Sequence, residues 1–136
     1  MTATVGVIVN ARAGKDIRRL SAHAAAPNDA SRAADLRRIV EGARHAGAER
    51  IVVATDHQGL VERALRGGGA DVELLDLTTV GTGDDTTAAA AAMRESDVDA
   101  LVVSGGDGTH RDVTRGWRDA PIVALAAGTN TWRPAV

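Results

Sequence analysis

The sequence predicts an α/β fold, with a doubly wound, mainly parallel sheet of about five to six strands and helices on both faces. Short, continuous apolar runs such as Val5–Val9 recur along the chain, as expected of parallel strands covered on both sides. Segments with helical features separate these runs, and this alternation implies right-handed crossovers within one sheet. Several runs end in polar or glycine-rich loops, which lie at the ligand-binding edge of such sheets.

The first part of the chain predicts a strand, a helix and a second strand. The run Val5–Val9 ends at Asn10, and residues 11–16 follow as a polar loop. Residues 17–26 show no clear period and stay undecided. The next helix ends at Gly47, and Arg50–Thr55 forms the second strand. This helix has the N-cap candidates Asn28, Asp29 and Ser31 and the apolar positions Ala33, Leu36, Ile39, Val40, Ala43 and Ala46.

The middle of the chain repeats this pattern. Asp56 is expected to cap a helix that ends in the three glycines at 67–69, and a third strand covers Val72–Leu77. A further helix runs through an alanine-rich stretch to Met93. Thr82, Asp84 and Asp85 are its candidate caps.

A strand at Ala100–Ser104 then stops in a glycine loop, and a helix through Val113 and Trp117 follows. The fifth strand, Pro121–Leu125, leads into a final loop. That loop holds Gly128, Thr129 and Asn130.

The glycine loop consists of Gly105, Gly106, Asp107, Gly108 and Thr109. Three glycines in four residues remove the side chains that keep a ligand from the backbone, so amide groups at the helix start can face a phosphate. Asp107 supplies one carboxylate beside that position. The pairing suggests phosphoryl chemistry, although an Asp-Gly pair also occurs in plain tight turns. Neither the P-loop nor the dinucleotide fingerprint fits, because Gly14-Lys15 precedes Asp16 and Arg111 replaces the third glycine.

Length, charge and composition narrow the function classes. The 136 residues suffice for one domain, here 1–136, and a net charge of -2 without a basic stripe argues against nucleic acid as partner. No segment predicts a signal peptide or a membrane span, so no membrane partner is expected. The absence of cysteine fits a cytoplasmic protein.

The loops that follow the first, fourth and fifth strands are expected to meet. In a parallel sheet, the carboxyl ends of the strands deliver their loops to one edge. The loops at Asn10–Asp16, Gly105–Thr109 and Gly128–Asn130 can therefore converge there, whereas the strand order itself is not readable from the sequence.

Four segments resemble ATP-NAD kinase-like proteins, within the superfamily of NAD, diacylglycerol and sphingosine kinases and 6-phosphofructokinases. The glycine loop matches the superfamily signature, and the branch found beside acetoin-catabolism genes is the most similar. The other three matching segments are Gly14–Leu20 with Ala22-His23 behind it, Asp85-Thr86-Thr87 and Gly128-Thr129-Asn130.

The resemblance implies an ATP-dependent kinase with Mg²⁺ that phosphorylates a hydroxyl, by default the 2′-hydroxyl of NAD to give NADP. It implies that Asp107 is the catalytic base. ATP and substrate would be bound by Asn10, Lys15, Gly105, Gly106, Gly108, Thr109, Gly128, Thr129 and Asn130. Lys15, the single lysine, would bring a positive charge near the phosphates.

Two features depart from the family. Ala11 stands where the family commonly has proline, and family members are about twice as long because of a β-rich carboxyl-terminal domain that is absent from this sequence. The chain is then a truncated product, part of a split enzyme completed by a homo-oligomer or a second chain, or a binding module. The alternatives to a kinase are a non-catalytic nucleotide-binding or regulatory module, or an assembly subunit.

A few other residues have competing interpretations. His110 either touches a ligand or is solvated, and Asp84 and Asp85 either cap a helix or pair on a metal. Because the remaining histidines have no metal-ligand spacing, no protein-held metal site is predicted. Those histidines are His23, His45 and His57. Trp117 is expected in the core, and Trp132 either stacks on an adenine or packs.

Overall fold

A computed structural model of the chain describes residues 3–10, 29–66 and 72–126. Strands and helices alternate within these ranges, and every strand pair is parallel, which confirms the predicted α/β fold. The strands are β1 (Thr4–Val9), β2 (Arg50–Ala54), β3 (Glu73–Leu75), β4 (Ala100–Gly105) and β5 (Ile122–Ala126). The helices are α2 (Asp29–His45), α3 (Leu60–Leu65), α4 (Gly83–Glu95) and α5 (Asp107–Gly116).

The sheet order is β3-β2-β1-β4-β5, so β1 lies in the centre. From β1 the chain steps outward to β2 and β3, then returns across the sheet to β4 and continues outward to β5. The direction of winding therefore reverses between β1 and β4. In open α/β sheets this switch point opens a crevice at the carboxyl ends of the two strands, and ligands bind there.

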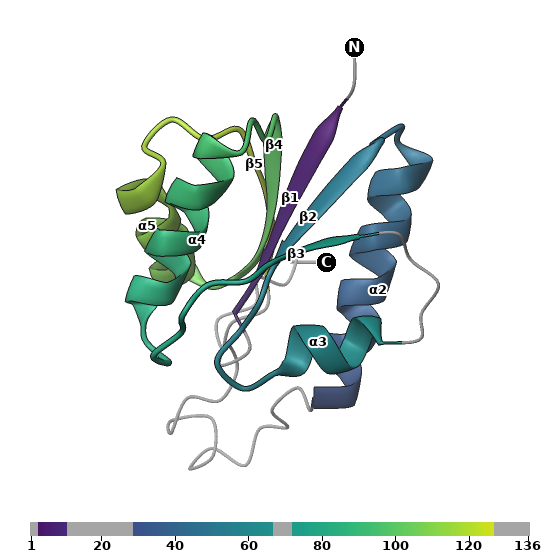
Figure 1. Cartoon of the computed structure of the whole chain (residues 1–136), viewed down its shortest axis with the longest axis horizontal. Coiled ribbons are helices and arrows are strands. Elements are labelled where there is room, and N and C mark those ends of the chain that lie inside the picture. The colour runs from purple at the N-terminus through teal and green to yellow at the C-terminus, as the bar shows by residue number, and fades with distance from the viewer. Residues whose placement is uncertain (1–2, 11–28, 67–71, 127–136) are drawn as a thin grey trace, which may run out of the picture.

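Helices cover both faces of the sheet, with α2 and α3 on one side and α4 and α5 on the other (Figure 1). Each layer buries its own apolar cluster against the sheet. The cluster beneath α2 and α3 contains Val7, Leu36, Val40, Ile51, Val53, Val61 and Ala64. The cluster beneath α4 and α5 includes Ile8, Val52, Met93, Val98, Leu101, Val103 and Val113.

Gly6 in β1 allows α4 to approach the central strand closely. A Cβ atom at this position would lie 2.6 Å from the Met93 sulfur and 2.8 Å from a Leu101 methyl carbon, well inside van der Waals contact. The bare backbone is thus what lets this part of the core close. None of the helices in the described ranges is long and apolar enough to cross a membrane.

The element ends differ from the sequence-based expectations in ways that have physical reasons. The N-cap residue of α3 is Gly59 rather than the expected Asp56. The Asp56 carboxylate nevertheless accepts the amides of Gln58, Leu60 and Val61 at 2.8–3.1 Å, and the last two begin the helix. The helix itself starts only after Gly59, whose φ is +72°. The third strand is shorter than Val72–Leu77, because β3 lies at the sheet edge and its pairing ends where β2 ends, at Ala54.

The fifth strand begins after Pro121 rather than at it. Proline lacks the N–H that a ladder needs, but its carbonyl accepts the amide of Leu101 at 2.8 Å. β5 lies at the other edge of the sheet, where Val123 and Leu125 are 56% and 38% exposed.

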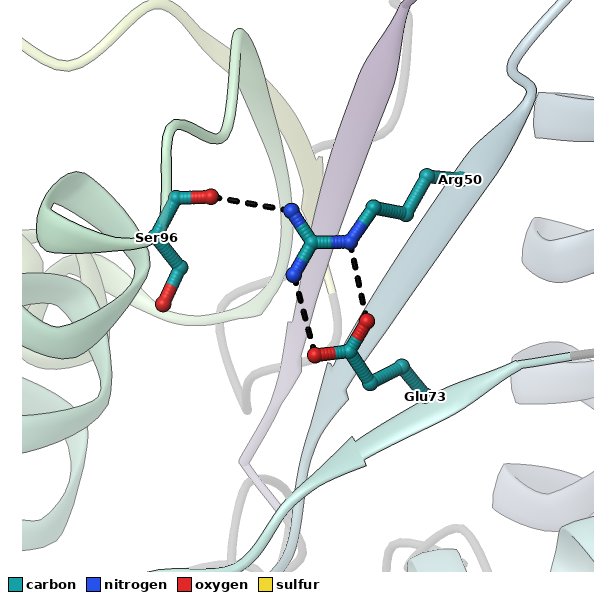
Figure 2. A network of polar contacts seen from close by, with 3 residues as sticks. All are labelled: Arg50, Glu73 and Ser96. Atoms are coloured by element: carbon teal, nitrogen blue, oxygen red, sulfur yellow. Dashed lines mark hydrogen bonds and ion pairs between the residues drawn. The ribbon is translucent and has the colours of Figure 1, made fainter.

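A polar network joins β2, β3 and the end of α4 at the amino ends of the strands, at the opposite end of the sheet from the glycine loop (Figure 2). Arg50, the first residue of β2, donates two hydrogen bonds of 2.8 and 2.9 Å to the carboxylate of Glu73 in β3. It also donates to the carbonyl of Ser96, just after α4, at 2.9 Å. The bond from Arg50 holds the pKa of Glu73 below its ordinary value, and the same bond raises the pKa of Arg50.

Candidate functional site

The carboxyl ends of β1 and β4 bring Asn10 and the glycine loop together. The two strands pair in register up to Val9 and Ser104. The amide of Asn10 extends this pairing by donating to the carbonyl of Ser104 at 2.9 Å. Two of the three loops that were expected to converge therefore begin side by side at the switch point.

Gly105 is the point at which β4 turns into α5. A Cβ atom there would lie only 2.5 to 2.8 Å from the side-chain atoms of Thr109, one helical turn ahead. Glycine is therefore needed at this position so that the first turn of α5 can fold back over the strand end. The first glycine of the loop motif thus lies where the end of β4 contacts the side chain of Thr109.

The first turn of α5 has backbone donors without a capping side chain. Gly106 is the N-cap residue and makes no side-chain cap hydrogen bond, and the first bond inside the helix runs from the amide of His110 to the carbonyl of Gly106. The amides of Asp107, Gly108 and Thr109 precede that bond, and such groups have no acceptor within a helix. Together with the helix dipole they favour an anion.

The space outside this turn is open. A Cβ atom on Gly108 would meet nothing within 4 Å, and both Gly108 and the carboxylate-bearing Asp107 are exposed. The loop thus presents a carboxylate beside a bare stretch of backbone, as its composition predicts. This arrangement can bind a phosphate and place a proton acceptor next to it.

Thr109 lies inside the loop rather than on its outer surface. Thr109 is only 4% exposed, and its hydroxyl oxygen accepts a hydrogen bond of 2.8 Å from the side-chain amide of Asn10. Both residues were expected to bind the ligand. In the structure their side chains bind each other, so their role in a site would include holding the loop against β1.

Arg32 is a residue of this region that the motif search did not identify. It lies in the first part of α2, is 3% exposed, and donates a hydrogen bond of 2.7 Å to the carbonyl of Asn10. A signal was present, because Arg32 precedes Leu36 and Val40 at four-residue spacing and so shares their buried helix face. An arginine at helical spacing from buried apolar residues indicates a cation that faces the core.

His110 contacts the loop through its ring. Its Nδ1 atom lies 2.8 Å from the carbonyl oxygen of Gly106, and since a carbonyl only accepts, Nδ1 carries the hydrogen. Its Nε2 atom is buried and has no hydrogen-bond partner among the described residues. His110 is half-buried and one ring nitrogen is bound to the loop, so the ring is not simply solvated. Contact of His110 with a ligand stays a prediction.

Asp84 and Asp85 belong to the start of α4. Thr82 is the N-cap and accepts the amide of Asp84, whereas the Asp85 carboxylate accepts the amides of Val80 and Gly81 at 2.8 and 2.7 Å. Thr82 is thus the N-cap among the three candidates, and the Asp85 carboxylate holds the turn before the helix. Within the described ranges, no group of three or more histidine, aspartate or glutamate residues is arranged to hold a metal ion.

The other residues considered in the sequence fall into two groups. Trp117 packs against the core cluster beneath α4 and α5 as expected, and His45 and His57 are exposed. Six further residues lie outside the described residues. They are Lys15, His23, Gly128, Thr129, Asn130 and Trp132.

Comparison with known proteins agrees with the fold and the loop. The family described as ATP-NAD kinase N-terminal domain matches residues 5–135. The chain is 36% identical to the Acetoin catabolism protein X of Cupriavidus necator over 139 residues, which cover 96% of this chain and 39% of that protein. It therefore spans well under half the length of this relative.

A second similarity is short. Over 32 residues, 24% of this chain and 13% of the relative, the chain is 56% identical to the 3-deoxy-manno-octulosonate cytidylyltransferase of Sodalis glossinidius. A match of this length assigns no family. The match over residues 5–135 does, and the chain belongs to the ATP-NAD kinase family.

Proposed function

We propose that the chain is the nucleotide-binding domain of an ATP-dependent kinase. The phosphates of ATP would bind at the amides of Asp107, Gly108 and Thr109, and the γ-phosphate would pass to a hydroxyl, by default the 2′-hydroxyl of NAD. The observation that carries this proposal is the uncapped first turn of α5 at the switch point, with the exposed Asp107 in it. Backbone donors at a helix start and one carboxylate suit phosphoryl transfer.

In this proposal Asp107 is the base. Its carboxylate accepts the proton of the acceptor hydroxyl while the hydroxyl oxygen forms a bond to the γ-phosphorus. The bond between that phosphorus and the β–γ bridging oxygen breaks, and ADP leaves with the electron pair. Mg²⁺, when bound, would screen the phosphate charge, and a single nearby carboxylate fits an ion held largely by phosphates and water.

The acceptor side of the cleft is a separate part of the proposal. Residues 1–136 would form one nucleotide-binding domain, and the acceptor pocket would come from the rest of a longer polypeptide or from a second chain. The chain covers only 39% of the length of its acetoin-catabolism relative, which favours this division. The same fact supports a second candidate function, a regulatory module that binds a nucleotide in acetoin catabolism without phosphoryl transfer.

Thermal melting with Mg-ATP, with NAD and with both, followed by a labelled phosphate-transfer assay, tests the proposal. A ligand that binds only the native state raises the melting temperature. A rise with Mg-ATP together with labelled NADP supports the kinase. A rise without transfer by this chain alone supports either the binding module or a kinase whose acceptor pocket is supplied by another segment or chain, and the same transfer assay on the polypeptide or complex that contains that pocket distinguishes the two. The absence of any rise contradicts both.

An aspartate variant and its control assign the base. In a polypeptide or complex that contains the acceptor pocket, Asp107→Asn removes the proton acceptor at nearly constant size, so binding of Mg-ATP should persist while transfer is lost. Asp119→Asn changes an exposed aspartate beyond α5 in the same way and should leave both unchanged. Full transfer by Asp107→Asn would refute the assignment of the base.

A further inference from the structure

We propose that Arg32 is a positioning residue for the nucleotide site and that it acts on the glycine loop through Asn10. This inference rests on the proposed function, because it concerns the same loop. It adds a residue that no family motif in this chain contains and that lies on the opposite helical layer from the loop.

The first step of the argument is the burial of Arg32. Arginine is almost never fully buried unless its charge is engaged, yet Arg32 is 3% exposed. Its Nη1 atom donates to the carbonyl oxygen of Asn10 at 2.7 Å, the short distance expected of a charge-assisted bond. The end of β1 is therefore fixed to α2 by a donor that does not titrate near neutral pH.

The second step is that Asn10 uses three of its polar groups at once. Its carbonyl accepts from Arg32, its amide donates to the carbonyl of Ser104 at 2.9 Å, and its side-chain amide donates to the hydroxyl of Thr109 at 2.8 Å. Asn10 thus connects α2, β4 and α5. The helices α2 and α5 lie on opposite faces of the sheet (Figure 1). Asn10 joins them to β4 at the switch point between β1 and β4.

The third step concerns the loop itself. Thr109 packs against Gly105 so tightly that a Cβ atom at Gly105 would lie 2.5 Å from the threonine hydroxyl oxygen. A displacement of Asn10 would therefore move Thr109, and Thr109 would move the first turn of α5 with the amides that face the ligand. Because catalytic and binding geometry tolerates little displacement, Arg32 would influence affinity without touching the nucleotide.

Variants of two arginines in α2 test this inference. Arg32→Met keeps an unbranched stem as far as the position of Nε and removes the donors, and Arg32→Lys keeps a charge and a donor. Arg37→Met is the control for loss of an arginine from α2. Arg37 is exposed, but it also donates to a backbone carbonyl, that of Ala64 at 3.3 Å, away from the loop. Titration calorimetry with Mg-ATP should show affinity about tenfold weaker for Arg32→Met, partly restored in Arg32→Lys, and within about twofold for Arg37→Met.

A double-mutant cycle separates positioning from a general loss of stability. If Arg32 acts through Asn10 and Thr109, Arg32→Met combined with Thr109→Val should bind Mg-ATP no more weakly than Thr109→Val alone. If the double variant bound Mg-ATP more weakly than either single variant, by the product of their two fold-changes, the inference would be overturned. Unchanged affinity in Arg32→Met would also overturn it.

Nuclear magnetic resonance without ligand gives a measurement that does not depend on nucleotide binding. Arg32→Lys or Arg32→Met should shift the side-chain amide resonances of Asn10 and the backbone amide of Thr109, whereas Arg37→Met should not. Unchanged resonances would overturn the link through Asn10. If the native chain fails to bind Mg-ATP while these shifts occur, the proposed function fails and the structural link to Asn10 stands.

Discussion

Replacement of Gly105 by alanine should destabilise the fold by clashing with Thr109. The added Cβ atom would lie 2.5, 2.6 and 2.8 Å from Oγ1, Cβ and Cγ2 of Thr109, compared with ordinary contacts of about 3.5–4.0 Å. The Thr109 side chain cannot move away freely, because its hydroxyl is hydrogen-bonded to Asn10 and Thr109 is only 4% exposed. The contact involves the Cβ atom of Thr109 itself, so a change of rotamer does not remove it.

The magnitude follows from two effects. Overpacking a buried site reduces the free energy of unfolding by about 1–3 kcal/mol, and loss of the bond between Asn10 and Thr109 adds about 1 kcal/mol. An unfolding entropy of about 2.1 cal/mol/K per residue gives about 0.29 kcal/mol/K for 136 residues. Each kcal/mol then lowers the melting temperature by about 3.5 °C, so Gly105→Ala should melt about 7–14 °C below the native chain.

Differential scanning calorimetry measures this shift directly. Gly42→Ala is the matched control, because Gly42 lies in α2 with nothing within 4 Å of the added atom. This control should melt at the native temperature or above it, since alanine favours helix over glycine by about 1 kcal/mol. A Gly105→Ala protein that melts within about 2 °C of the native chain would refute the reasoning, because Thr109 would then be free to yield.

Three further changes test the loop, the start of α3 and the network at the amino ends of the strands. Gly108→Ala should leave the melting temperature of the free protein unchanged or raise it slightly, since its Cβ would face open space and alanine favours helix over glycine. It should weaken Mg-ATP binding about tenfold, and native affinity by calorimetry would contradict the placement of the phosphates. Asp56→Ala should lower the free energy of unfolding in urea by about 1–2 kcal/mol, because three amides lose their acceptor; a loss below about 0.3 kcal/mol would contradict this. The Arg50–Glu73 pair is partly exposed, so Glu73→Gln should lose less than about 1 kcal/mol at pH 7. The folded pKa of Glu73 is lowered, so its contribution is present above the unfolded value of about 4.3 and is lost as the pH falls through the folded value. The difference between the native chain and Glu73→Gln should therefore vanish in acid, and a constant difference would contradict the assignment.

Much of the fold is visible in the order of residues along the chain. The apolar runs and the caps mark the strands and helices to within a few residues, because burial on both faces and backbone capping are local requirements. The helix ending at Gly47 is an example, since φ there is +103° and glycine adopts it readily. The strand order is different, because pairing of β1 with β4 depends on contacts between distant segments.

The candidate site divides in the same way. The sequence predicts the glycine loop and Asp107 as a candidate site, because all the residues of this motif are consecutive in the chain. The hydrogen bond between Asn10 and Thr109 was not predicted, because it joins positions 99 residues apart. It also depends on where the first turn of α5 begins, after the N-cap Gly106. Arg32 was missed because charged residues in an amphipathic helix are usually assigned to the solvent face.

The central position of β1 has a consequence for how the protein is made. During synthesis, β1 emerges first, but one of its two neighbours in the sheet, β4, follows only after β2 and β3, and the amide of Thr4 bonds to the carboxylate of Asp99, 95 residues later. Contacts of such long range close slowly, because the intervening chain must first be ordered. The nascent chain therefore has β1 and β2 available long before the crevice between β1 and β4 can exist. The proposed nucleotide site can therefore form only late in folding, and a ligand bound there would stabilise the finished sheet rather than guide its early steps.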